Sequence, residues 1–146
     1  MRTQFNEAQL ANPVVQAADE ILRTCVHCGF CLSSCPTYNL LGDELDSPRG
    51  RIYLIKDMLE GDKPASETVV THLDRCLSCL ACQDICPSDV NYMHLVDPAR
   101  AHIEETYKRP MADRLLRRLL GYVMPRPATF SALMGLAALR RRLSRR

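Results

Sequence analysis

The sequence has few large aromatic residues, and its cysteine content is below that of a disulfide-rich protein. Its 146 residues include no tryptophan, three phenylalanines and five tyrosines, so the core cannot rest on large aromatic side chains. Eight cysteines are fewer than the 8–10% that is roughly typical of a disulfide scaffold. An apolar content of 47% is ordinary for a globular protein, so we do not expect wholesale disorder.

A long apolar run is also missing. The longest, Ala128–Leu139, covers 12 residues and contains two hydroxyl side chains, whereas a membrane-spanning helix needs about 20 apolar residues. The first residues, MRTQFNEAQLANPVVQ, contain neither the apolar core nor the cleavage site of a secretory signal. We therefore expect a cytoplasmic chain without a transmembrane segment, whose reduced thiols are free to bind metal.

Acidic residues almost disappear from the C-terminal part. Residues 1–107 carry eight Lys or Arg and 16 Asp or Glu, whereas residues 108–146 carry 11 basic residues and one acid, Asp113. The net charge of +2 thus combines an acidic body with a basic tail. We predict two domains, 1–107 and a basic amphipathic helical extension at 108–146. Such a tail suits an anionic partner surface.

Helix signals recur along the chain, and no alternating strand pattern of useful length accompanies them. Asn12 and Ser47 each precede a proline, as an N-cap precedes the first helical residue. The second of these helices carries Ile52 and Ile55 at helical spacing and is expected to end at Gly61. The sequence therefore predicts a mainly α-helical fold. Further helices are expected at Pro64–Arg75, at Pro98–Lys108 with Asp97 as its cap, at Met111–Gly121 and at Ala128–Leu143.

Cysteine occurs in two runs of the same pattern, C-x2-C-x2-C-x3-C-P, which begin 51 residues apart. This run is typical of two-cluster ferredoxins, in which three cysteines of a loop hold one [4Fe–4S] cluster and the fourth ligates the other. We therefore expect two [4Fe–4S] clusters, and this crossing would tie the two halves of the domain together. The first cluster is expected on Cys25, Cys28, Cys31 and Cys86, and the second on Cys76, Cys79, Cys82 and Cys35.

Residues beside the cysteines suggest supporting roles. Gly29 lies inside the first loop, where the backbone must approach sulfur closely. Phe30 and Ile85 are expected to supply an apolar shell that excludes water from the clusters. His27 and His72 lie near the loops, but eight thiolates already fill the eight ligand positions. We therefore expect both histidines beside the ligands or on the surface.

Two zinc sites of four cysteines each would use the same ligand count. Zinc sites usually pair two separated C-x2-C knuckles, and they rarely need a third cysteine and a fourth before proline, twice. A structural zinc-binding interaction module therefore stays as the alternative from another class. The sequence offers no glycine-rich nucleotide motif, and every cysteine is assigned to a cluster, so no catalytic residue is expected.

Leucines and arginines alternate in the tail. A basic amphipathic helix can lie on an anionic membrane surface or dock on an acidic protein partner, and we favour the protein partner. Nucleic acid is disfavoured because no known recognition module is present. The tail residues are Arg114, Leu115, Leu116, Arg117, Arg118, Leu119, Leu120, Val123, Leu133, Leu136, Leu139, Arg140, Arg141, Arg142, Leu143, Arg145 and Arg146.

The stretch CVHCGFCLSSCPTYNLLGDELDSPRGRIYLIKDMLEG, followed by HLDRCLSCLACQDICPS, closely resembles the iron–sulfur subunit of bacterial glycolate oxidase (glycolate dehydrogenase). The likeness extends from Ile21 to about Pro127. The cysteine motifs alone are shared with iron–sulfur subunits of anaerobic glycerol-3-phosphate dehydrogenase, lactate-utilisation complexes and heterodisulfide reductase, which remain alternatives. The segment PTYNLLGDELDSPRGRIYLIK favours the glycolate family.

The resemblance implies an α-helical ferredoxin-like domain with two [4Fe–4S] clusters on the eight cysteines. It implies a complex whose flavin-containing oxidase subunits oxidise glycolate to glyoxylate and pass electrons through this subunit to an acceptor such as quinone. The chain would then be cytoplasmic or peripheral on the inner membrane face. Family members continue into a second half with Cys-Cys-Gly-type repeats, whereas this chain has no cysteine after Cys86. We therefore expect the N-terminal portion of a longer subunit.

Overall fold

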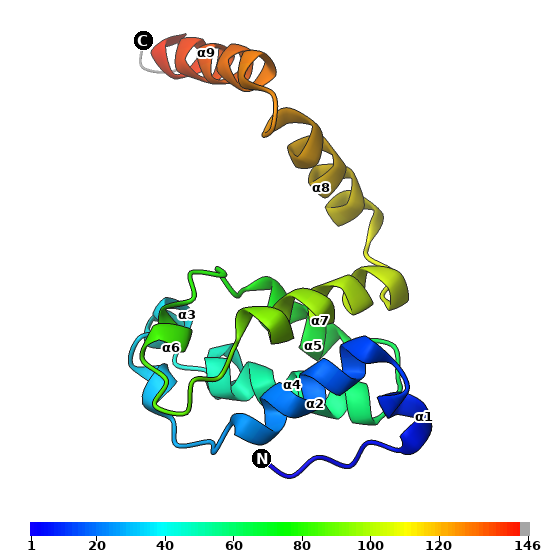
Figure 1. Ribbon diagram of the computed structural model, residues 1–146. Coiled ribbons are helices and arrows are strands. Elements are labelled where there is room, and N and C mark those ends of the chain that lie inside the picture. The colour runs from blue at the N-terminus through cyan, green and yellow to red at the C-terminus, as the bar shows by residue number, and fades with distance from the viewer. Residues whose placement is uncertain (144–146) are drawn as a thin grey trace. The chain divides into compact units, whose positions relative to one another are not determined.

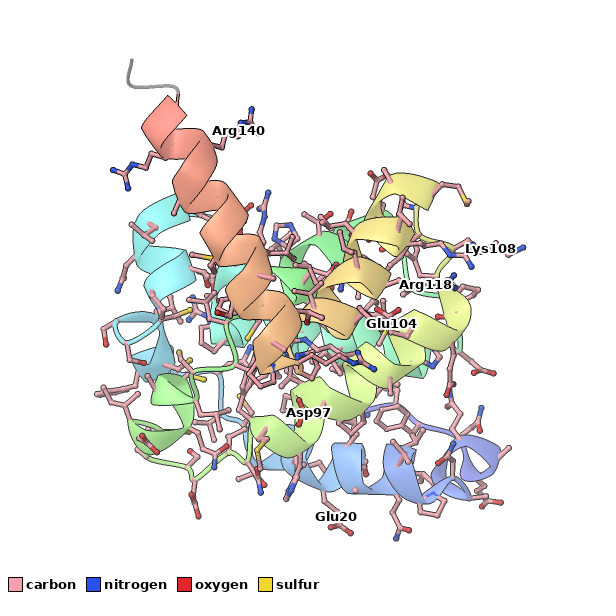
Figure 2. All side chains as sticks on the ribbon, turned by 90° about the horizontal axis from the view of Figure 1, so that it is seen from above. Glu20, Asp97, Glu104, Lys108, Arg118 and Arg140 are labelled. Carbon is pink, nitrogen blue, oxygen red and sulfur yellow. The ribbon has the colours of Figure 1, made fainter. Side chains whose placement is uncertain are left out.

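The computed structural model describes residues 1–143, and all regular secondary structure in these residues is helical (Figure 1). The prediction of a mainly α-helical chain is confirmed. The chain divides into two compact units, Met1–Tyr107 and Lys108–Arg146, and this division falls where the charge changes sign. Figure 2 shows acidic side chains such as Glu20 and Asp97 on the larger unit and basic ones such as Arg118 on the second.

The larger unit contains seven α-helices and two short 3-10 turns within its described residues. They are α1 (Glu7–Leu10), α2 (Pro13–Thr24), η1 (Phe30–Leu32), α3 (Pro36–Leu41), η2 (Glu44–Asp46), α4 (Pro48–Glu60), α5 (Glu67–Asp74), α6 (Ala81–Asp84) and α7 (Met93–Thr106).

Side-chain caps fix where the main helices begin. The Asn12 side chain accepts a hydrogen bond from the Val14 amide and begins α2, and the Ser47 hydroxyl accepts one from the Gly50 amide and begins α4, as predicted. Helix α5 begins later than expected because the Ser66 hydroxyl caps it. The sequence did not predict the short helices α1, α3 and α6. Such helices of four to six residues offer too few turns for a hydrophobic period to be visible.

Helix α7 corrects the prediction that Asp97 caps a helix beginning at Pro98. The helix begins at Met93 and contains Pro98, and Asp97 is exposed within it. The proline removes one backbone hydrogen bond from the helix. The earlier start buries Leu95 and Val96, which are 1% and 0% exposed, and burial of two such side chains outweighs one lost hydrogen bond.

One apolar core lies among α2, α4, α5 and α7, in which α4 and α7 contact each other and both α2 and α5. Leu22, Ile55, Leu73 and Ile103 contribute completely buried side chains, one from each of these helices. The two cysteine loops follow the C-terminal ends of α2 and α5, so the packing of these helices sets the distance between the loops. Figure 1 shows α3 and α6 together at the end of this helical layer opposite α1.

The second unit contains α8 (Met111–Val123) and α9 (Pro127–Leu143) in its described residues. Helix α8 is amphipathic, and its leucines lie largely exposed at positions 115, 116, 119 and 120. The side chains of Leu136, Leu139, Arg142 and Leu143, and residues Arg145 and Arg146, lie outside the described part of the predicted tail surface. Among the described helices, none is both long and apolar enough to cross a membrane.

Gly50 is the glycine of α4 that has no room for a side chain. A Cβ atom there would overlap the carbonyl oxygen of Glu44 and lie 2.9 Å from the Cα atom of Leu45. We expect Gly50→Ala to lower the free energy of unfolding by about 1–3 kcal/mol, because backbone must move to accept the methyl group.

Thermal unfolding of the purified protein measures this effect. Gly61→Ala is the matched control, because Gly61 has an ordinary right-handed conformation at the end of the same helix. An equal loss in both variants would contradict the steric explanation.

Candidate metal centre

The two cysteine loops share the same backbone bends. The residues two and four positions after the first cysteine have positive φ in both loops: His27 (58°) and Gly29 (86°) in the first, Ser78 (51°) and Leu80 (59°) in the second. Residues other than glycine rarely adopt this conformation, which costs roughly 1–2 kcal/mol each. The sequence repeat is therefore also a conformational repeat, and these bends turn the cysteines of each loop toward one centre.

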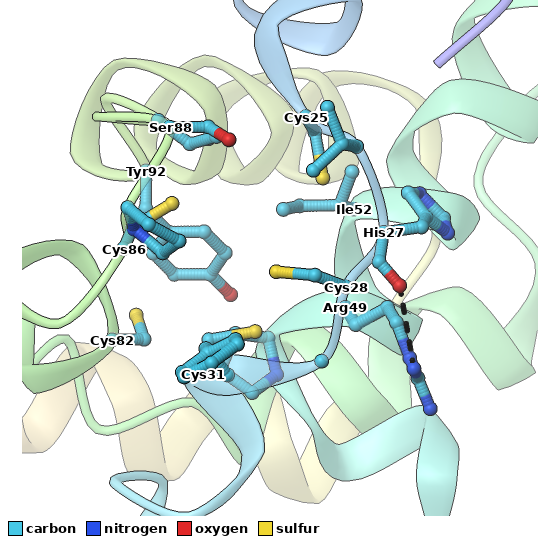
Figure 3. Close-up of a pocket in the computed structure, with 16 residues that line it drawn as sticks. Cys25, His27, Cys28, Cys31, Arg49, Ile52, Cys82, Cys86, Ser88 and Tyr92 are labelled. Atoms are coloured by element: carbon cyan, nitrogen blue, oxygen red, sulfur yellow. Dashed lines mark hydrogen bonds between the residues drawn. The ribbon is translucent and has the colours of Figure 1, made fainter.

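A first cavity lies beside the first loop (Figure 3). Its walls include the apolar side chains of Ile52, Val90 and Pro48 and the ring of Tyr92. The cysteines of the cavity come from both loops, three from the first and two from the second. They are Cys25, Cys28, Cys31, Cys82 and Cys86.

A second cavity lies beside the second loop. Tyr92, Pro48 and Cys82 line this cavity as well as the first, so the two cavities are neighbours. Its cysteines are Cys35, Cys76, Cys79 and Cys82. Cys35 therefore leaves its own loop for the second cavity, and Cys86 leaves its own loop for the first. This is the grouping expected from the spacing, and all eight thiols are free. The assignment of ligands to clusters stays a prediction.

The sulfur atoms are not gathered closely enough to surround a single metal ion. Four thiolates around one zinc ion lie about 2.3 Å from the metal, which places tetrahedral sulfurs about 3.8 Å apart. Among the described residues, which include all eight cysteines, no three cysteine sulfurs lie within 4.8 Å of one another. The donor set is soft thiolate throughout, which is typical of iron–sulfur sites. These residues therefore fit [4Fe–4S] clusters.

A buried charged network lies beside the second cavity. The carboxylate of Asp46 is completely buried, with Oδ1 2.9 Å from Nδ1 of His72 and 3.4 Å from Nη2 of Arg51. Nη1 of Arg75 donates to Oδ2 at 2.8 Å. Burial alone would raise the pKa of Asp46, but the hydrogen bonds from His72 and Arg75 outweigh it and hold this pKa below its ordinary value. Asp46 is therefore ionised at neutral pH.

Asp43, Asp46 and His72 also place possible ligand atoms within 4.8 Å of one another. Asp46 already accepts hydrogen bonds from Arg51 and Arg75, whose positive charges repel a metal cation. We therefore interpret this cluster as an ion-pair network.

Individual thiols at the two cavities differ in their pKa. Burial, together with neighbouring thiolates, raises the pKa of Cys31 to about 11 and that of Cys82 to about 12. Burial also acts on Cys35, but hydrogen bonds from the Thr37 hydroxyl, the Tyr38 backbone and Arg51 outweigh it and lower its pKa. Because thiol ligands must lose their protons, metal binding at Cys31 and Cys82 releases protons at neutral pH.

The structure changes the expected surroundings of the cysteines. Phe30 lines the first cavity but is 63% exposed, and Ile85 is 43% exposed and lines neither cavity. Phe30 is thus placed at the first cavity as predicted, whereas the prediction is wrong for Ile85; the buried Ile52 and Tyr92 also contribute to the cavity walls. His27 lines the first cavity.

Sequence reasoning missed three polar side chains at the second cavity, Arg51, Thr37 and Tyr92. Arg51 carried a signal: it lies four residues before Ile55, so an arginine occupies the buried stripe of α4. His72, expected beside the ligands or on the surface, is buried next to Asp46.

Comparison with known proteins agrees with this geometry. Residues 21–90, which contain all eight cysteines, match the 4Fe-4S dicluster domain family. The chain is 55% identical over 133 residues to the glycolate oxidase iron-sulfur subunit of Escherichia coli (strain K12), covering 91% of this chain and 32% of that protein. The resemblance predicted from the sequence is confirmed.

A second relative is the probable glycolate oxidase iron-sulfur subunit of Bacillus subtilis (strain 168). It is 41% identical over 120 residues, which are 81% of this chain and 27% of that protein. The chain thus spans less than a third of the length of either relative. No solved structure matches it.

Asp46 is the anion that balances the buried arginine. We expect Asp46→Asn to lower the free energy of unfolding by about 3 kcal/mol at pH 7, because it leaves a buried guanidinium without its counter-charge. The folded pKa of Asp46 lies below its ordinary value of 3.8. The stabilisation is therefore complete above that value and fades as the pH falls through the folded pKa.

Urea unfolding of the wild-type chain and of Asp46→Asn at a series of pH values measures the difference between their free energies of unfolding. This difference should be constant from neutral pH to about pH 5 and shrink below it. Asp57→Asn is the control, because Asp57 is an exposed aspartate on α4, the helix that carries Arg51. A difference that grows toward low pH would exclude the charged role of Asp46.

Proposed function

We propose that this chain binds two [4Fe–4S] clusters and transfers electrons within a glycolate-oxidising complex. The observation that carries this proposal is the pair of neighbouring cavities, each lined by three cysteines of one loop together with cysteine from the other. Cys82 and Cys86 join the first loop's cysteines in the first cavity, and Cys35 joins the second loop's cysteines in the second. Bound there, a [4Fe–4S] cluster accepts and releases one electron at a potential that its surroundings set. In this assignment Cys25, Cys28, Cys31 and Cys86 hold the first cluster, and Cys76, Cys79, Cys82 and Cys35 hold the second.

The chemistry of glycolate explains why such a subunit needs partners. Oxidation of glycolate to glyoxylate removes two electrons and two protons. A flavin in a partner subunit takes them as a pair, whereas iron–sulfur clusters carry electrons singly. The relatives are named as iron-sulfur subunits of glycolate oxidase. We therefore assign the substrate site to flavin-containing partner subunits and electron transport to this chain, toward an acceptor such as quinone at the inner membrane.

Exposed groups beside the cysteines suit electron exchange with partners. Cys28 is exposed, and its neighbours Val26 and Phe30 are 67% and 63% exposed. Cys79 is exposed in the second loop, next to Leu77 at 66%. Exposed apolar side chains around a redox centre favour a protein partner that covers them, because such patches are unfavourable in water. Each cavity thus has its own contact point for a partner.

Helix α8 supports a further contact with the complex. Its leucines are exposed on one side, and basic side chains such as Arg114 and Arg118 accompany them. The leucines suit burial against protein, and the arginines suit an acidic rim around that contact. We therefore propose that α8 docks on another part of the complex.

The exchange of the fourth cysteine predicts an unusual pattern in double variants. After anaerobic reconstitution the wild-type chain should hold about eight irons and eight sulfides. Cys35→Ala should disable the second cluster and leave about four irons. Adding Cys79→Ala should then cost little more, because the same cluster is affected, whereas adding Cys28→Ala should remove most of the remaining iron.

The reverse pattern, in which Cys28→Ala adds nothing to Cys35→Ala, would show that each loop holds its own cluster. Binding of zinc in place of iron would support the alternative of a structural zinc module. Iron and sulfide analysis of the same samples separates these outcomes.

The glycolate assignment is tested by reduction of the clusters in the assembled complex. The chain should copurify with a flavoprotein, and glycolate added anaerobically should bleach its visible absorption, since electrons reach the clusters. Leu116→Asp should weaken copurification without loss of iron, while Val14→Asp, an exposed substitution on α2, should not.

Lactate, glycerol 3-phosphate and a heterodisulfide-linked donor are the comparison substrates. Bleaching by one of them, with none by glycolate, would assign the chain to a related complex.

A further inference from the structure

Arg51 is the largest completely buried side chain among the described residues, at 1% exposed. Hydrogen bonds hold its guanidinium on every side. Nε donates to the His72 carbonyl at 2.7 Å, and Nη2 donates to the Thr37 hydroxyl at 3.0 Å and to Oδ1 of Asp46 at 3.4 Å. Nη1 points to Sγ of Cys35 at 3.8 Å. One edge of the guanidinium is thus fixed on a cysteine of the second cavity.

Other polar groups approach the same cavity. Oγ1 of Thr37 lies 3.2 Å from Sγ of Cys35, and the buried hydroxyl of Tyr92 lies 3.8 Å from Sγ of Cys76. The second cavity therefore has two side chains that can donate hydrogen bonds to its thiolates, Arg51 and Tyr92, and Arg51 is a buried cation. The hydroxyl of Thr37 also lies beside Cys35, but it donates its hydrogen to the Asp46 carbonyl at 2.9 Å.

The first cavity is different. Within the described residues, no side chain makes a hydrogen bond to a sulfur of its cysteines. Arg49 lines it, but Nε of Arg49 pairs with Glu44 at 2.8 Å and the side chain is 32% exposed. Solvent and Glu44 thus screen the charge of Arg49 far more than protein screens that of Arg51.

We propose that Arg51 sets the potential of the second site and makes it the more readily reduced of the two iron–sulfur sites. This inference rests on the proposed function. Reduction adds one negative charge to a cluster, and a buried positive charge with an N–H group on a thiolate ligand stabilises that charge. The hydroxyl of Tyr92 acts in the same direction. Arg51 therefore acts on the reduction potential of the second site, and an electron that enters the chain resides there preferentially.

The surroundings of Arg51 make the sign of this effect testable in two directions. The carboxylate of Asp46 opposes the positive charge at Nη2, while Nη1 faces the sulfur of Cys35. Removing Arg51 should make the second site harder to reduce, whereas removing the charge of Asp46 should make it easier to reduce. A side chain that only packed the core would not give opposite shifts.

The experiment is a redox titration of the reconstituted full chain with dithionite, followed by electron paramagnetic resonance. Arg51→Gln should lower the potential of one cluster by at least a tenfold change in its one-electron equilibrium, about 59 mV. Arg51→Lys should retain most of the wild-type potential, and Tyr92→Phe should lower it by less than Arg51→Gln. Asp46→Asn should raise it. Lys56→Gln removes a positive charge elsewhere on the same helix and should change neither potential.

The shifted signal identifies the site. It should be the higher-potential signal, be lost in Cys35→Ala and persist in Cys86→Ala. A shift in the other signal, or no shift with Arg51→Gln, would overturn the inference while the iron content still supported the proposed function. If Arg51→Gln fails to fold, Asp46→Asn decides, because an unchanged or lowered potential there contradicts the inference. A wild-type chain without iron–sulfur signals would instead refute the proposed function.

Discussion

Both cysteine-lined cavities draw on both loops, because Cys86 reaches the cavity of the first loop and Cys35 reaches that of the second. The loops begin 51 residues apart and meet only because α2 and α5, whose ends carry them, pack in one core with α4 and α7. Burial, and after it the neighbouring thiolates, raises the pKa of Cys31 and that of Cys82, so these thiols are hard to ionise. In the proposed assignment, metal binding would offset that cost, and cluster assembly would be coupled to folding.

The features that the sequence predicted well are those set by neighbours along the chain. Asn12 and Ser47 cap their helices because an N-cap needs a backbone amide only two or three residues away. The cysteine spacing predicts the two loops for the same reason, and it predicts the exchange because the motif repeats completely. Asp97 failed as a cap because burial of Leu95 and Val96 decided where α7 begins. Burial depends on packing partners that a local pattern does not contain.

The polar side chains of the second cavity could not be predicted from the sequence, because their contacts join residues far apart along the chain. Arg51 reaches the carbonyl of His72, 21 residues away, and the sulfur of Cys35, 16 residues away. Tyr92 reaches Cys76 across 16 residues and lines both cavities. An arginine on α4 is by itself an ordinary surface residue, and only its place in the stripe of Ile55 and Met58 indicates burial. The sequence therefore predicted which cysteines gather at the two cavities and missed the polar groups that surround them.

Stability alone does not explain why a guanidinium lies in this position. Removing two charges from water is costly, and replacing a buried ion pair with apolar side chains of similar size is often neutral or stabilising. The pair of Arg51 with Asp46 is also loose, at 3.4 Å, and Asp46 has closer partners in His72 and Arg75. Asp46 thus keeps two closer partners without Arg51, whereas Arg51 has Asp46 as its anionic partner. What Arg51 alone supplies is a fixed positive charge beside the sulfur of Cys35, and a charge in that place acts on any electron that arrives there.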